Sequence, residues 1–244
     1  MSARVISGKE VAEEILSNDL RLRVEKLKSK NIVPKLVVIL VGEMKASASY
    51  VAQKEKFAGK AGIESEVRRF EDTISEEEIL DEINKINTDS SIHGVIVQLP
   101  LPKHISVTKV LNSIDPSKDV DGFTPSNVGK LFLGEDTLVS CTPKGIMSIL
   151  KSADVNLTGM NVTVIGRSNI VGKPVSILCQ QQNATVTMCH SKTRDLNAKL
   201  ADADVIIVAA GVPKFINGDQ IPNGAVVVDV SYTHLRAHET RYHL

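Results

Sequence analysis

The stretch NVTVIGRSNIVGKPVSILCQQQNATVTMCH, residues 161–190, decides the fold class. It opens with a short apolar run rich in β-branched residues at 161–166, and a second such run closes it at 185–190. Between them, a turn containing Gly166 and Gly172 leads into the segment IVGKPVSILCQQQ. Short apolar runs separated by a helical segment predict parallel strands joined by a helix.

The same alternation continues on both sides of this stretch. Further runs with strand character lie at 36–42, 94–100, 204–211 and 225–230, and runs with helical character at 47–62, 75–89 and 142–153. Ser75 and the acidic residues after it predict a helix start, and we expect Thr142 to cap a helix whose first residue is Pro143. The pattern predicts an α/β protein with parallel sheets that helices cover on both faces.

Residues 121–143 are richer in Gly, Pro, Ser and Thr than their surroundings, which is typical of a domain boundary. We therefore expect one domain at 1–139 and a second at 140–231, with residues 232–244 as a separate tail.

The bulk composition argues against several kinds of partner. Lys+Arg and Asp+Glu are both 29, so the net charge is zero and does not favour nucleic acid or an anionic membrane. Three cysteines without CxxC spacing argue against a disulfide framework and structural zinc, and we expect a cytoplasmic protein.

The turn VIGRSNIVGKP at 164–174 has the place of a nucleotide-binding turn, because it follows a strand and opens a helix. It is not a GxGxxG motif, and taken alone it is equally consistent with an ordinary strand-to-helix turn. After the next strand stands Ser191, where NAD-preferring folds usually carry an acid. Ser191 with Arg167 nearby would accept a 2′-phosphate, so we expect NADP rather than NAD. Gly211 offers a further turn at which the backbone could closely approach a nucleotide.

Three features of the first half are candidates for chemistry. Tyr50 and Lys54 are four residues apart on one expected helix and so share a face. Gln98 ends an apolar strand, at the edge where α/β sheets bind ligands. The loop DPSKDVDGF at 115–123 holds three aspartates but lacks the glutamate of a calcium loop. A surface lysine, a glutamine that bonds at the strand end and a solvated turn remain the ordinary alternatives.

Seven motifs occur together in one order: GEMKASASYVAQKEK, GVIVQLPLP, DPSKDVDGF, CTPKGIMSIL, VIGRSNIVGKP, ATVTMCHSKT and ADVIIVAAGVPKFI. As a set they resemble the bifunctional methylenetetrahydrofolate dehydrogenase/cyclohydrolase family over residues 2–230. The resemblance implies two α/β domains flanking a cleft, a folate-binding catalytic domain and a Rossmann-type NADP-binding domain, and a homodimer formed through the latter. It also implies the oxidation of 5,10-methylenetetrahydrofolate with NADP, followed by hydrolysis of the methenyl product to 10-formyltetrahydrofolate.

The resemblance assigns roles to particular residues. Lys54 matches the catalytic lysine, which is suited to proton transfer, and Gln98 matches the residue that holds it. Asp121 matches the carboxylate that binds the pterin, and Tyr50 the aromatic residue that packs on the folate ring system. The further contacts that it implies are those of Val97 and Leu99 with folate and of Gly166, Arg167, Ser168 and Ser191 with NADP. The chemistry requires no metal.

The resemblance ends at Val230. Ser231 and Tyr232 stand where the family usually has a glycine and a branched apolar residue, and the family's PGGVGPMT-like folate loop and last helix are absent. The ending SYTHLRAHETRYHL resembles translated sequencing-adapter DNA, so we predict that 232–244 are not native and that the chain folds poorly. A disordered native tail and a metal site at His234 and His238 are the other interpretations. Two alternative functions stay open: an inactive NADP-binding or dimerising fragment, and an unrelated oxidoreductase of the shikimate dehydrogenase type.

Overall fold

The computed structural model describes residues 4–42, 45–212 and 215–230. The predictions for the tail fall on residues 231–244 and lie outside these described residues. The chain divides into two compact units. The first unit comprises residues 12–129, and the second comprises the residues from 130 onward together with those up to 11. In the described part of the chain, no helix combines the length and the apolar composition needed to cross a membrane.

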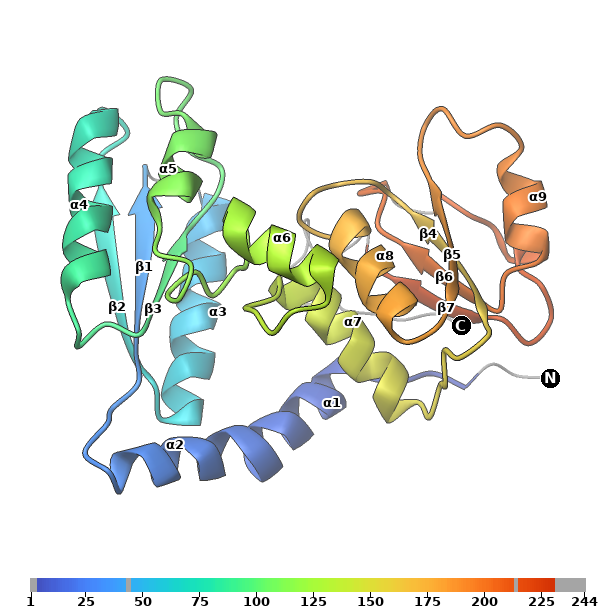
Figure 1. Cartoon of the computed structure of the whole chain (residues 1–244), viewed down its shortest axis with the longest axis horizontal. Helices are drawn as coiled ribbons and strands as arrows, with labels where there is room; N and C mark the ends of the chain where they lie inside the picture. The colour runs from blue at the N-terminus through green and yellow to red at the C-terminus, as the bar shows by residue number, and fades with distance from the viewer. Residues whose placement is uncertain (1–3, 43–44, 213–214, 231–244) are drawn as a thin grey trace. The chain divides into compact units, whose positions relative to one another are not determined.

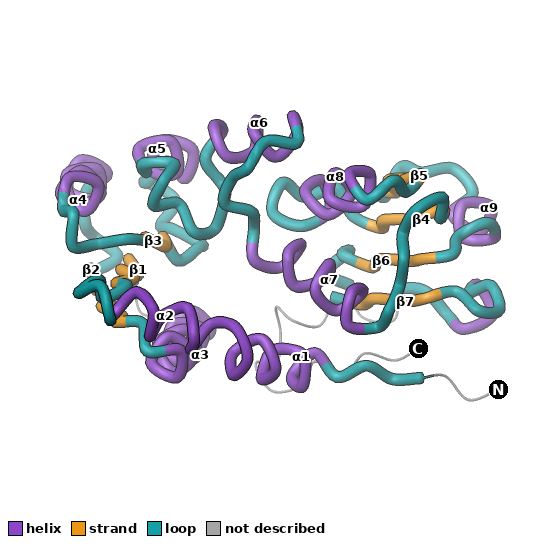
Figure 2. Tube along the Cα trace, turned by 60° about the horizontal axis from the view of Figure 1, so that its bottom comes forward, coloured by secondary structure: helices purple, strands orange, loops and turns teal. Residues whose placement is uncertain are grey.

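The first unit is built on a three-stranded parallel sheet (Figure 1). The central strand β1 (Lys35–Val41) pairs with β2 (Glu64–Phe70) on one side and β3 (Gly94–Val97) on the other. Helices α4 (Glu76–Thr88) and α5 (Val107–Ser113) pack on the face that presents Val37 and Ile39, and α3 (Lys45–Ala61) packs on the face with Val38 and Leu40 (Figure 2). Each face of β1 is therefore buried, as its continuous apolar run predicts.

The second unit contains a four-stranded parallel sheet in the order β5-β4-β6-β7. Its strands are β4 (Asn161–Ile165), β5 (Thr185–Cys189), β6 (Val205–Val208) and β7 (Val226–Asp229). Helices α7 (Cys141–Ser152) and α8 (Gly172–Gln181) cover one face, and α9 (Leu196–Ala201) covers the other (Figure 1). The chain leaves β4 toward β5 and returns to the other side of β4 as β6. The strand order therefore reverses at β4, which creates the position where open sheets bind ligands.

The remaining elements are short or lie at the ends of the units. They are α1 (Gly8–Ile15), a π-helical turn (Leu16–Leu20), α2 (Arg21–Lys28), α6 (Pro125–Leu133) and a 3₁₀ turn (Gly218–Gln220). The structure confirms the predicted α/β class, and each predicted strand lies within two residues of its expected start. The expected cap at Thr142 is wrong, because α7 begins at Cys141 and Ser140 precedes it. Pro143 is tolerated inside that first turn, since the first four N–H groups of a helix have no intrahelical partner.

Strand β2 and helix α6 are among the elements that the sequence prediction lacks. Strand β2 reads ESEVRRF and is polar because it lies at the edge of its sheet, where its residues are mostly half-buried. Helix α6 lies inside the stretch expected to be a domain boundary. Thr124, just before its first residue Pro125, accepts a hydrogen bond at Oγ1 from the Asn127 N–H at 3.4 Å. A capping threonine followed by proline is a helix-start signal that would have revealed α6.

Candidate active site

Gln98 connects the first sheet to the helix that carries the candidate lysine. It directly follows β3, and its backbone N–H donates to the Ile39 carbonyl of β1 at 2.9 Å. The side-chain Nε2 donates to the Leu99 carbonyl at 2.9 Å, which leaves Oε1 facing α3. Lys54 Nζ donates to that Oε1 at 3.2 Å, and both side chains are partly buried. The structure therefore brings together Lys54 and Gln98, the pair that the family resemblance implies.

Tyr50 and Lys54 share a face of α3, as their spacing predicts. Lys54 Nζ lies 5.9 Å from the centroid of the Tyr50 ring. The Tyr50 side chain is 39% exposed, so its ring can offer a surface to a ligand beside the ammonium group. Lys56, two residues further along α3, is exposed to solvent. The ammonium of Lys54 thus has a glutamine oxygen and an aromatic ring as neighbours.

Asp121 stands in the turn that follows the loop at 115–119 and is partly buried. Burial raises the pKa of its carboxyl group, the positive charge of Lys54 lowers it, and the negative charge of Asp119 raises it further. The net direction is upward. The positive charge of Lys54 thus acts on the Asp121 carboxyl group, whose buried surroundings disfavour its ionised form.

The two predicted folate contacts beside Gln98 differ in exposure. Val97 is 3% exposed and belongs to the core on the α4 face, so only its backbone could contact a ligand. Leu99 is partly buried, and its carbonyl already accepts from Gln98. Loop 115–123 is not simply a solvated turn, because Asp119 within it is 1% exposed. Sequence alone could not single out Asp119 among three aspartates.

The turn after β4 is shaped by two glycines. Gly166 has φ +132°, and a Cβ there would lie 2.4 Å from the Ala209 carbonyl oxygen, directly after β6. A Cβ at Gly172, the first residue of α8, would lie 2.2 Å from the Gly166 oxygen and 2.9 Å from the Arg167 nitrogen. Both positions therefore require glycine. They hold the β4–α8 turn close to the end of β6, at the point where strand order reverses.

The other predicted nucleotide contacts lie at the same carboxyl edge. Arg167 and Ser168 follow Gly166 and are exposed. Ser168 Oγ accepts from the backbone N–H groups of Val171 and Gly172 at 3.1 and 3.3 Å. Ser191 is exposed in the turn after β5. There, the His190 N–H donates to Thr193 Oγ1 at 2.8 Å, a contact that the sequence analysis missed. Because β4 and β5 are parallel and paired, these turns are neighbours.

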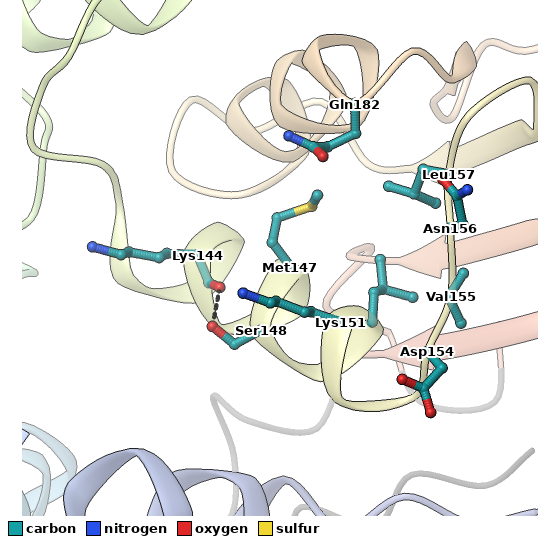
Figure 3. A pocket seen from close by; sticks show the side chains of 10 residues that line it. Lys144, Met147, Ser148, Lys151, Asp154, Val155, Asn156, Leu157 and Gln182 are labelled. Carbon is teal, nitrogen blue, oxygen red and sulfur yellow. Dashed lines mark hydrogen bonds between the residues drawn. The ribbon is translucent and has the colours of Figure 1, made fainter. Parts of the chain in front are cut away.

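A hollow of about 570 Å³ lies elsewhere in the second unit, beside α7 and the segment that leads into β4 (Figure 3). Its lining includes Lys144, Met147 and Lys151 of α7, and Gln182 after α8. These residues precede β4 and β5, so the hollow is at the amino edge of the sheet, opposite the glycine turn. It contains none of the predicted site residues. Among the described residues, no group of three or more His, Cys, Asp or Glu side chains is placed to hold a metal ion.

The fold is that of an α/β enzyme of the dehydrogenase class, with a tight glycine turn at the carboxyl edge of one parallel sheet and a lysine–glutamine pair beside the other. Residues 6–121 match the profile of the tetrahydrofolate dehydrogenase/cyclohydrolase catalytic domain, and residues 140–243 match that of its NAD(P)-binding domain. The chain belongs to the tetrahydrofolate dehydrogenase/cyclohydrolase family.

Relatives agree with this placement. The bifunctional protein FolD of Staphylococcus aureus (strain MRSA252) is 51% identical over 233 residues, which are 96% of this chain and 81% of that protein. The crystal structure of the bifunctional FolD enzyme from Campylobacter jejuni is similar with a TM-score of 0.89 and 45% identity, covering 91% of this chain and 79% of that one. The Trypanosoma brucei enzyme, solved with NADP cofactor and inhibitor, has a TM-score of 0.88 and 34% identity over 93% and 78% of the chains.

Proposed function

We propose that this chain oxidises 5,10-methylenetetrahydrofolate to the 5,10-methenyl form with NADP and hydrolyses that product to 10-formyltetrahydrofolate, as part of one-carbon folate metabolism. Membership of the family supports both reactions. The observation that carries the proposal to particular atoms is the hydrogen bond between Lys54 Nζ and Gln98 Oε1, beside Asp121.

The first unit would bind folate. An ionised Asp121 can accept two N–H groups from the edge of a pterin ring, a pairing for which a carboxylate is well suited. Tyr50 offers its ring face to the folate ring system, and the backbone at Val97 and Leu99 borders the same strand end. Lys54, held in place by Gln98, would move a proton where water opens the methenyl carbon–nitrogen bond. General acid–base catalysis of this kind contributes about 10²- to 10⁴-fold to a rate.

The second unit would bind NADP, which accepts the hydride when bound. The turn at Gly166 and Gly172 fits a nucleotide, since a Cβ at either position would fill the space that the turn keeps free of side chains. Arg167 would pair with a 2′-phosphate, and Ser168 and Ser191 would donate hydrogen bonds at the same edge. No acidic side chain stands at Ser191 to repel that phosphate.

A homodimer formed through the second unit is part of this proposal. Phe132 and Leu133, adjacent at the end of α6, are each 71% exposed, and large apolar side chains together at a surface favour a protein contact. We also propose a reducing, cytoplasmic location, which the three cysteines favour because none of them forms a disulfide. Light scattering of the purified chain would measure the oligomeric state.

The proposed function is tested by two assays on the wild type, Lys54→Met and Lys56→Met. One follows methenyltetrahydrofolate formation from the methylene substrate and NADP, and the other follows hydrolysis of supplied methenyltetrahydrofolate. We expect Lys54→Met to lose hydrolysis by about 100-fold or more, because the proton-transfer group is gone. Lys56→Met, an exposed lysine on the same helix, is the matched control and should retain both activities. Equal hydrolysis by both variants would overturn the assignment of Lys54, and a wild type inactive in both assays would favour the inactive-fragment alternative.

A further inference from the structure

Asp119 is a buried carboxylate in the loop that carries Asp121. Its side chain is 1% exposed, and burying a carboxylate is costly unless hydrogen bonds compensate for the lost water. Two donors reach the same atom: Asp119 Oδ2 accepts the Thr124 N–H at 2.8 Å and Asn127 Nδ2 at 2.9 Å. Thr124 and Asn127 are 2% and 3% exposed. Both donors belong to the start of α6, where a negative charge is favourable.

These bonds join the loop to its surroundings on both sides. Asn127 Nδ2 also donates to the Pro116 carbonyl at 2.9 Å, so one amide group ties the beginning of the loop to Asp119. The Asp119 carbonyl accepts the Gly122 N–H at 3.1 Å, which closes the turn containing Asp121. The Lys118 carbonyl accepts the Val95 N–H of β3 at 2.8 Å. The position of Asp121 therefore depends on a loop fixed between β3 and α6 by Asp119.

Asp119 also acts on Asp121 through its charge. The charged groups that shift the pKa of the Asp121 carboxyl are Lys54 on α3, which lowers it, and Asp119 in its own loop, which raises it. The two aspartates thus have different surroundings. Asp119 is compensated by the amino end of α6, while Asp121 is partly buried, with Lys54 as the opposing charge.

We propose that Asp119 is a positioning residue for the folate-binding carboxylate: it fixes the turn that presents Asp121 and places a second negative charge beside it. The inference rests on the proposed function, in which an ionised Asp121 binds the pterin edge. Protonation of Asp121 would then remove one acceptor position and weaken folate binding as the pH falls. Burial is the main cause of the raised Asp121 pKa, and the negative charge of Asp119 moves that loss further toward higher pH.

The variant Asp119→Asn separates charge from geometry. Both hydrogen bonds end on one oxygen, so an asparagine oxygen in its place keeps both donors paired while the charge is lost. Asp119→Ala removes the charge and leaves the Thr124 N–H and the Asn127 amide without this partner. Asp115→Asn is the matched control in the same loop, since Asp115 Oδ1 accepts from the N–H and hydroxyl of Ser117 in a local turn that asparagine also forms.

The first measurement is the pH profile of KM and kcat for the methylene substrate at saturating NADP. We expect Asp119→Asn to keep kcat within about twofold and to move the acid rise in KM to lower pH, because the neighbouring negative charge is gone. Asp119→Ala should raise KM by about tenfold at neutral pH with a smaller effect on kcat, because the turn is no longer fixed. Asp115→Asn should follow the wild type. An Asp119→Asn profile identical to that of Asp115→Asn would overturn the proposal.

The second measurement needs no folate. Carbon-13 NMR of carboxyl-labelled aspartate follows the titration of Asp121 in the folded protein, with Asp121→Asn identifying its signal. A lower midpoint in Asp119→Asn than in the wild type supports the proposal, and an unchanged midpoint overturns it. This NMR comparison is between Asp119→Asn and the wild type, so it remains valid if Asp119→Ala does not fold. A wild type that neither binds nor converts folate would contradict the proposed function, while the NMR midpoint would still decide whether Asp119 acts on Asp121.

Discussion

The surroundings of Asp121 disfavour its ionised form, so the stability of the folded protein depends on pH at this residue. Burial raises its pKa in the folded protein above the unfolded value. A raised carboxyl pKa contributes stability below the unfolded value, and that contribution is lost as the pH rises through the folded value. Above the unfolded value, therefore, the Asp121 carboxyl group lowers the stability of the folded state, a cost that accompanies a carboxylate kept for ligand binding.

We therefore expect Asp121→Asn to melt at a temperature equal to or above that of the wild type near neutral pH. The difference should shrink as the pH falls toward the ordinary aspartate range, where the wild-type carboxyl is protonated. KM for the folate substrate should rise by about 10- to 100-fold, because charge-assisted hydrogen bonds are lost. Thermal melts across this pH range and steady-state kinetics check both parts. A variant that melts below the wild type at every pH would contradict the argument.

At the scale of single residues, the site residues that could be predicted from the sequence are those whose positions depend on local periodicity. The spacing of Tyr50 and Lys54 is enough to bring the ring and the ammonium together, because residues four apart share a helix face. Gln98 was predictable as the residue after an apolar strand. Asp119 was not, since its burial depends on Thr124 and Asn127 at the start of a helix that the sequence analysis did not predict.

Among the elements, α4 begins with a complete capping box. Ser75 Oγ accepts the Glu78 N–H at 3.2 Å, and the Glu78 carboxylate accepts the Ser75 N–H at 3.0 Å. Hydrogen bonds from Ser75 lower the pKa of Glu78 below its usual value. A lowered carboxyl pKa stabilises the protein above the unfolded value, and this stabilisation is lost as the pH falls through the folded value. The helix it starts places Ile79 and Ile83 in the core of the first unit.

Removal of this cap by Ser75→Ala should destabilise the protein by about 1 kcal/mol, the usual effect of losing a serine cap. The corresponding fall in melting temperature is about 2–4 °C for a chain of this size. Ser148→Ala is the control, because its hydroxyl donates to the Lys144 carbonyl within α7 and caps no helix end. Denaturant unfolding at neutral pH measures both. Equal stability of the two variants would mean that this capping box contributes nothing to the fold.

Strands were predictable from the sequence where both of their faces are buried. The runs at β1, β3, β4 and β6 are apolar on both faces because helices cover both faces of each sheet, so the sequence marks them clearly. At the edge of a sheet this signal disappears. Strand β2 (ESEVRRF) has four charged residues among its seven, and Arg68 pairs with Glu66 of the same strand and with Glu82 of α4, so its sequence resembles that of a polar surface segment.

At the scale of the whole molecule, the two proposed sites belong to different compact units. Tyr50, Lys54, Gln98 and Asp121 lie within residues 12–129, and the glycine turn lies in the unit that begins at 130. Each unit has its own parallel sheet and its own buried core. Substitutions in separate cores with no shared partners usually have additive effects, so damage to one site should leave the other intact. The two reactions differ in what they need: oxidation needs both sites, and hydrolysis needs only the folate site.

Gly172→Ala tests this division against Gly145→Ala, the same change in α7 of the same unit. A Cβ at Gly172 would lie 2.2 Å from the Gly166 oxygen, whereas a Cβ at Gly145 meets no atom within 4 Å. We expect Gly172→Ala to displace the turn and to weaken NADP binding and methylene oxidation by about tenfold or more, as overpacking of a tight site costs about 1–3 kcal/mol. Hydrolysis of supplied methenyltetrahydrofolate should persist, the reverse of the effect of Lys54→Met, and Gly145→Ala should behave as wild type. NADP titration with both activity assays decides the matter. Unchanged NADP affinity in Gly172→Ala would remove this turn from the cofactor site, and loss of both reactions would show that the units do not act separately.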